Sequence, residues 1–74
     1  MIEELDVVAL TKPLPAHNLQ AGDTGTVVMV LGGGKAYIVE FVTFDGTTIA
    51  IETVEASAIR PIEGHEIAQS RAMA

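Results

Sequence analysis

Residues 21–28, which read AGDTGTVV, constrain the fold more than any other part of the chain. Gly22 and Gly25 can adopt backbone angles that are closed to other residues. Asp23 can hydrogen-bond to its own following backbone and so hold a turn. The segment then becomes rich in Thr and Val, which favour strands. This pattern predicts a tight turn that leads directly into a buried strand.

Turn-forming residues divide the rest of the chain into short apolar runs. The five runs are residues 5–10, 24–31, 36–43, 48–54 and 59–62. Proline lacks the backbone donor that a central strand needs, so Pro13 and Pro15 predict a loop over residues 11–22. Asp45 and Gly46 are a strong hairpin signal, and residues 55–58 are expected to form one helical turn. We therefore expect an all-β, five-stranded antiparallel small barrel over residues 1–62, followed by a C-terminal tail over residues 63–74.

The period of two in a strand assigns the faces of the two central runs. In the third run Glu40 marks the outside, so Tyr37, Val39 and Phe41 are expected to point inward. In the fourth run Glu52 marks the outside in the same way, which places Ile49, Ile51 and Thr53 inside.

The loops between runs fix which inward residues pair. Pairing Phe41 with Ile51 needs an odd number of loop residues, so we expect a loop of three or five residues with Gly46 left-handed. A four-residue loop over residues 32–35 pairs Val30 with Tyr37, and Val28 with Val39.

This register leaves an apolar cluster on the outer face of the sheet. Val27, Met29, Ile38 and Val42 all point outward around Glu40. An exposed cluster of this kind marks an interface, a surface covered by another part of the chain such as residues 63–74, or a face that is wrongly assigned. The residues expected to contact a partner are Val27, Met29, Ile38, Glu40, Val42 and Glu52.

Composition limits the partner classes. Four Lys and Arg stand against ten Asp and Glu, giving a net charge of −6 that repels phosphate backbones and favours basic partners. No apolar run is long enough to span a membrane, and the start of the chain is acidic where a signal peptide is basic. The absence of cysteine fits a reducing compartment. We expect a cytoplasmic protein that binds neither membranes nor nucleic acid.

No residue pattern indicates catalysis, a metal or a cofactor. His17 and His65 are the two histidines, and neither belongs to a pair with zinc-ligand spacing. Ser57 lacks the context of an activated nucleophile. The glycines at 32–34 precede a strand and not the helix that would hold a phosphate. The sequence therefore predicts a protein that is not an enzyme and carries no cofactor.

Several segments together resemble one protein family. They are residues 5–10 (LDVVAL), Leu14 with Pro15, the Leu19, Gly22, Gly25 and Val27 spacing, residues 37–41 (YIVEF) and residues 59–61 (IRP). The set resembles a group of small bacterial proteins, common in cyanobacteria, that is known only as a domain of unknown function. The resemblance implies an SH3-like fold and an antitoxin-like or accessory role beside another small protein, and it implies no functional residues.

These observations predict a non-enzymatic protein-binding module. Its partner is expected to be another protein with a basic or apolar surface, or a second copy in a homo-oligomer. The alternative is a nucleic-acid-associated module, because the turn at residues 22–27 also resembles that of KOW-type ribosomal and transcription modules. Such modules bind through basic and aromatic surfaces, whereas this chain has one Tyr, two Phe and no Trp.

Overall fold

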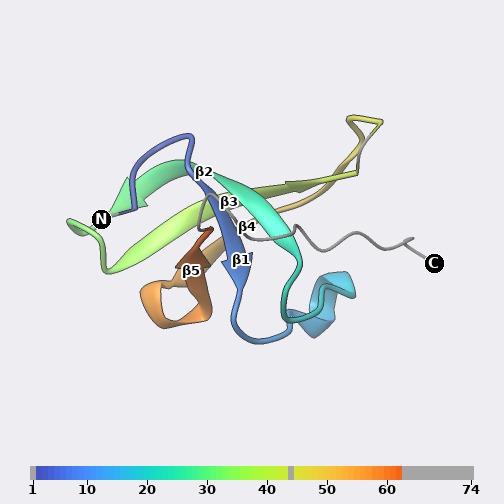
Figure 1. Cartoon of the computed structure of the whole chain (residues 1–74), viewed down its shortest axis with the longest axis horizontal. Coiled ribbons are helices and arrows are strands. Elements are labelled where there is room, and N and C mark those ends of the chain that lie inside the picture. The colour runs from blue at the N-terminus through green and yellow to red at the C-terminus, as the bar shows by residue number, and fades with distance from the viewer. Residues whose placement is uncertain (1, 44, 63–74) are drawn as a thin grey trace.

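The chain forms one antiparallel sheet of five strands in the order β4-β3-β2-β1-β5 (Figure 1). The computed structural model describes residues 2–43 and 45–62. Its elements are β1 (Val7–Leu10), η1 (Pro15–His17), β2 (Thr24–Leu31), β3 (Ala36–Val42), β4 (Thr48–Glu55), η2 (Ala56–Ala58) and β5 (Ile59–Pro61), where η denotes a short 3-10 helix. The all-β class and the five predicted strands are confirmed. The predicted tail, residues 63–74, lies outside the described residues.

Prolines and a glycine determine the path of the long connection between β1 and β2. Pro15 opens η1, in keeping with the loop predicted there. Gly22 has a φ of 92°, in the region that favours glycine. The Asp23 carboxylate accepts a hydrogen bond from the backbone N–H of Gln20 at 2.8 Å. This hydrogen bond closes the turn before β2.

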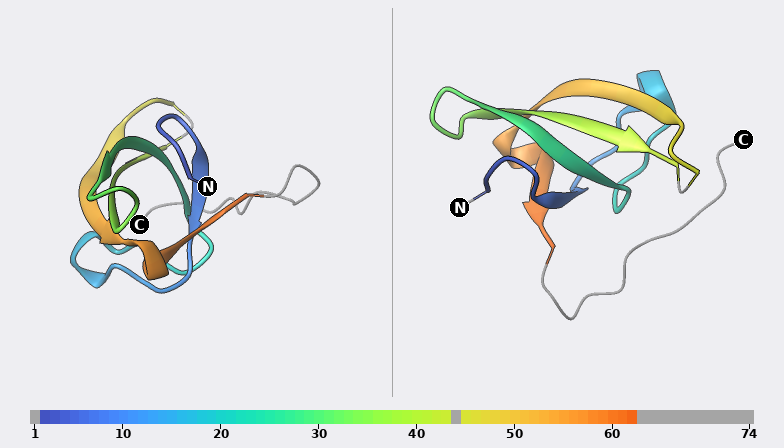
Figure 2. Two further views of the ribbon diagram at one scale, coloured as in Figure 1. Left: turned by 90° about the vertical axis from the view of Figure 1, so that its left-hand side faces the viewer. Right: turned by 90° about the horizontal axis from the view of Figure 1, so that it is seen from above.

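The sheet bends strongly around its interior. In the left-hand view of Figure 2, β1 (blue) and β4 (yellow to orange) lie on opposite sides of the interior. The two edges of the sheet are β4 and β5, and η2 connects them. The sheet is therefore open, because the ladder of hydrogen bonds does not pass from β4 to β5.

The core lies on the inner face of this curved sheet. Tyr37, Val39 and Phe41 of β3 are at most 4% exposed, which confirms the face predicted for that strand. The other buried members of the core are Val8, Leu10, Leu19, Val27, Ala50, Val54, Ala58 and Ile59. Every strand contributes, so the core depends on the whole sheet and not on one hairpin.

A β-bulge in β2 changes the face of part of that strand. Val30 pairs with Tyr37 as predicted, but Val27, and not Val28, pairs with Val39. The register shifts between Val27 and Met29, so one extra residue is accommodated in β2. Val27 therefore points into the core and is 0% exposed. The prediction that Val27 points outward is wrong.

A second bulge changes the face of β4. Val42 pairs with Thr48, which leaves five residues between them, one of the two predicted loop lengths, and Gly46 has a φ of 89°, as predicted. The register then shifts, and Phe41 pairs with Ala50 in place of Ile51. Ala50 and Val54 consequently point inward and are buried.

This shift corrects three predicted positions in β4. Ile51 and Thr53, expected inside, are exposed, and Glu52, expected outside, lies opposite the buried Val39 on the inner face. The predicted inward direction of Ile49 holds, because it is half-buried and packs against the core.

Candidate protein-binding surface

The outer face of the sheet carries a cluster of exposed apolar side chains, which we call the outer patch. Its members are Val7, Met29, Ile38, Val42 and Ile51, and they surround Glu40. Met29 and Val42 are each 48% exposed and Ile51 is 59% exposed. Scattered surface apolar residues are ordinary, but a contiguous group on adjacent strands is typical of an interaction surface.

Strand register shows that the outer patch is contiguous. Met29 of β2 lies directly opposite Ile38 of β3. In the neighbouring row, Thr26 lies opposite Glu40, which in turn lies opposite Ile51 of β4. Directly opposed residues on one face have Cβ atoms about 4.5–5.5 Å apart, so these side chains are close enough to be covered by one partner.

Val7 extends this row to a fourth strand. It pairs with Thr26 and is 51% exposed, whereas its neighbour Val8 is 1% exposed and belongs to the core. The outer patch therefore reaches from β1 to the free edge at β4.

Four of the six residues predicted to contact a partner lie on this face. They are Met29, Ile38, Glu40 and Val42. Val27 is excluded because it is fully buried. Glu52 does not belong to the outer patch, because the bulge places it on the opposite face of the sheet.

The side chain of Glu52 instead contacts the segment that joins β1 to β2. Its Oε2 atom lies 2.6 Å from Nε2 of His17 in η1. The two side chains are 34% and 39% exposed, so this contact is half open to water. The pair gives the charged residue on the inner face a partner, and it lies between η1 and that side of the sheet.

Sequence reasoning missed Ile51 and Val7 as members of the surface. Ile51 was missed because Glu52 was used as the marker of the outside, and the bulge near Ile49 reverses that phase. Val7 was missed because residues 7–10 are all apolar, so the sequence of β1 shows no alternation from which a face could be assigned.

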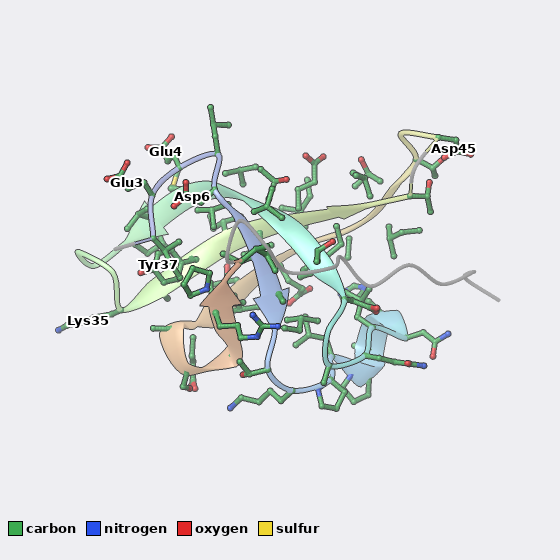
Figure 3. The ribbon with its side chains drawn as sticks, viewed as in Figure 1. Glu3, Glu4, Asp6, Lys35, Tyr37 and Asp45 are labelled. Carbon is green, nitrogen blue, oxygen red and sulfur yellow. The ribbon has the colours of Figure 1, made fainter. Side chains whose placement is uncertain are left out.

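Charge is distributed unevenly around this surface. Between residues 36 and 58 the charged side chains are Glu40, Asp45, Glu52 and Glu55, all acidic. Figure 3 shows a further acidic group, Glu3, Glu4 and Asp6, at the start of the chain, with Asp45 at the far tip of the β3–β4 hairpin. A partner that covers the outer patch meets a negative field, which attracts basic groups.

The described residues contain no group of three or more His, Cys, Asp or Glu side chains that could hold a metal ion. Across the same part of the chain, no helix has the length and apolar character needed to cross a membrane.

Comparison with known proteins places the chain in a family. The family model described as a domain of unknown function, DUF4926, matches residues 4–61. The chain belongs to this family. The match covers all five strands, from before β1 to the last residue of β5, so the family domain is the curved sheet with its outer patch. No curated protein and no solved structure matches the chain.

Proposed function

We propose that the chain is a non-enzymatic protein-binding module whose outer patch docks a protein partner. The observation that carries this proposal is the group of half-exposed apolar side chains on neighbouring strands, Met29, Val42 and Ile51, around Glu40. A module of this kind works as an antitoxin-like or complex-accessory subunit in the cytoplasm. The absence of cysteine from the chain agrees with that reducing compartment.

Three features support an SH3-like small barrel as the fold of this module. The first and last strands, β1 and β5, are paired at one side of the sheet. A long connection that contains η1 separates β1 from β2, and η2 alone separates β4 from β5. The strong bend of the sheet brings the five strands around one core, as in a barrel.

The charge of the chain favours a basic protein over nucleic acid and over a second copy. The net charge is −6, and the described residues of β3 and β4 contribute no Lys or Arg. Like charges close together across an interface oppose association, so a homo-oligomer is the less favoured occupant of the outer patch. The acidic surface likewise gives no support to the nucleic-acid alternative.

Paired variants test the proposal in the native host. The full chain is used to capture partners, alongside Met29→Glu, which puts a charge in the outer patch, and Ala16→Glu, which puts the same charge on the exposed surface of η1. A specific partner is expected to be lost with Met29→Glu and kept with Ala16→Glu. Binding that survives Met29→Glu and Ile38→Glu in folded protein contradicts the proposal.

A further inference from the structure

The two edges of the sheet differ in how well they are protected against pairing with another strand. Natural edge strands are usually short, or carry proline, lysine or bulges that block further pairing. The edge strand β5 has three residues and ends at Pro61. The other edge strand, β4, has eight residues and contains neither proline nor lysine. Its bulge lies near Ile49, so the remainder of the strand is regular.

The ladder between β3 and β4 determines which backbone groups of β4 remain available. Ala56 donates its backbone N–H to Lys35 O, and the register continues unbroken from Ala36↔Glu55 to Phe41↔Ala50. Hydrogen-bonded residues alternate in an antiparallel pair, so Glu52 and Val54 bond to β3. The N–H and C=O groups of Ile51 and Thr53 therefore point away from the sheet, and both residues are exposed.

We propose that β4 accepts an extended segment of a basic protein partner as an added antiparallel strand. This inference rests on the proposed function, because it specifies how the partner of the outer patch is held. The added strand exchanges backbone hydrogen bonds with Ile51 and Thr53. Its outward side chains extend the outer patch beyond Ile51, which is already 59% exposed.

The side chains of β4 specify the chemistry of that segment. Ile51 and Glu55 both lie on the outer face, since they pair with Glu40 and Ala36, while Glu52 lies on the inner face. An antiparallel partner strand therefore places an apolar residue opposite Ile51 and basic residues opposite Glu52 and Glu55. Two carboxylates in a strand without lysine or arginine select this basic segment over a second β4 strand.

A designed peptide tests the inference. The probe is the capped sequence Thr-Arg-Val-Thr-Lys-Ile-Thr, which places Arg opposite Glu55, Lys opposite Glu52 and Ile opposite Ile51. It is added to the full-length chain, and amide hydrogen exchange is followed by NMR. Exchange at Ile51 and Thr53 is expected to slow when the peptide binds, while Glu52 and Val54, already bonded to β3, serve as internal references.

Matched peptides separate strand addition from simple charge attraction. N-methylation of the Arg, central Thr and Ile amides, which face β4, is expected to abolish binding. N-methylation of the Val and Lys amides, which face away, is expected to preserve it. A peptide with Glu in place of Arg and Lys is expected not to bind. Equal binding of the two N-methylated peptides overturns the proposal.

Protein variants test the same contact from the other side. Glu55→Gln is expected to weaken peptide binding about two- to fivefold, the size of an exposed ion pair. Glu4→Gln removes the same charge from the turn before β1, which is separated from β4 by β2 and β3, and is expected to leave binding unchanged. Thr53→Pro removes one edge N–H and is expected to abolish binding, whereas Thr53→Val keeps that N–H and binding. If Thr53→Pro does not fold, amide exchange in the unchanged chain with the peptide still tests the proposal.

Three further outcomes overturn the inference. The first is unchanged exchange at Ile51 and Thr53 with saturating peptide. The second is slow exchange at both residues in dilute protein without peptide, which means that another part of the chain covers the edge. The third is protection that grows with protein concentration together with a doubled mass, which makes a second copy the occupant. If the peptide test fails but Met29→Glu still abolishes binding of the native partner, the docking function stands and only the strand addition is wrong.

Discussion

Glycine at position 25 is required by packing and not by its backbone angles. A Cβ atom there would lie 2.6 Å from Cγ1 of Val39 and 2.9 Å from both the Glu40 carbonyl oxygen and Cδ1 of Phe41. The sequence predicts that Gly25 supplies backbone angles closed to other residues, but its φ is not positive and the crowding comes from the neighbouring strand β3. Gly25 thus allows β2 and β3 to approach closely at the centre of the sheet.

Gly25→Ala is expected to destabilise the fold by about 1–3 kcal/mol, because backbone and two buried side chains must shift. Gly46 has open space around it but a φ of 89°, so Gly46→Ala is expected to cost about 1–2 kcal/mol through strain alone. Urea unfolding of both variants measures these costs. Equal stability of Gly25→Ala and the unchanged chain contradicts the close approach of the strands.

Gly33 needs a correction of the same kind. The glycine-rich hairpin in the sequence predicts on its own that alanine is tolerated at position 33, and nothing lies within 4 Å of an added Cβ atom. Its φ of 70° nevertheless lies in the left-handed region. Gly33→Ala is therefore expected to lower the free energy of unfolding by about 1 kcal/mol, and Gly33→Asn by less, because Asn adopts this region more readily. Equal losses in the two variants contradict this cause.

Asp45 provides a prediction on pH. Hydrogen bonds from the Thr43 hydroxyl and then from the Thr47 backbone N–H stabilise the charged carboxylate and hold the pKa of Asp45 below its usual value. A lowered pKa in the folded state makes a contribution to stability that is present above the unfolded-state pKa and is lost as pH falls through the folded-state pKa. NMR titration is expected to show this pKa below that of an unstructured Asp, and Thr43→Val is expected to raise it. If Asp45 titrates with the ordinary pKa of Asp, the loop hydrogen bonds do not stabilise its charged form.

At the scale of elements, the strands and the face of β3 followed from sequence, but the faces of parts of β2 and β4 did not. Turn residues and the period of two located β2 at residues 24–31 and the others to within a few residues. The two β-bulges were not visible, because an extra residue in a strand changes no composition and leaves each side of it alternating correctly. One extra residue reverses every side chain beyond it, and this is why Val27 and Ile51 were assigned to the wrong faces.

Val27 and Met29, on either side of the bulge in β2, are expected to respond very differently to substitution. Val27 is 0% exposed and Met29 is 48% exposed on the other face. Val27→Ala is expected to cost about 2 kcal/mol through the cavity it leaves, whereas Met29→Ala is expected to stay within about 0.5 kcal/mol. Thermal and urea melts of the pair measure the difference. Similar losses of stability at both positions would mean that the bulge does not lie between Val27 and Met29.

The contact between η1 and β4 is expected to contribute little to stability. His17 and Glu52 are each more than a third exposed, and exposed pairs contribute about 0–1 kcal/mol. A double-mutant cycle with His17→Ala and Glu52→Ala measures their coupling. A coupling well above this range would show that the pair is shielded from water in solution and that it holds the β1–β2 connection on the sheet.

At the scale of the whole molecule, sequence predicted that an apolar face of the sheet is exposed, but not all of the residues on it. Charge, the shortage of aromatic residues and the excess of apolar residues on the outer face can all be read without a structure. The extent of the outer patch depends on which strands are neighbours, and β1 and β4 come to one face only after the sheet order is known. Met29, Ile38, Glu40 and Val42 were therefore found, while Val7 and Ile51 needed the strand register.

The same charge balance predicts that the chain does not bind nucleic acid. Affinity for RNA or DNA comes largely from phosphate contacts by Lys and Arg, and this chain has four of them against ten acids. Base stacking offers no substitute, because the chain holds three aromatic residues and Tyr37 and Phe41 are buried in the core. Fluorescence anisotropy with a generic single-stranded RNA and a DNA duplex is expected to show no binding at physiological salt. A neutralised variant with Glu3, Glu4 and Asp6 changed to their amides serves as a control for charge repulsion. Micromolar binding by the unchanged chain that weakens with added salt would contradict the protein-docking function and favour a nucleic-acid module.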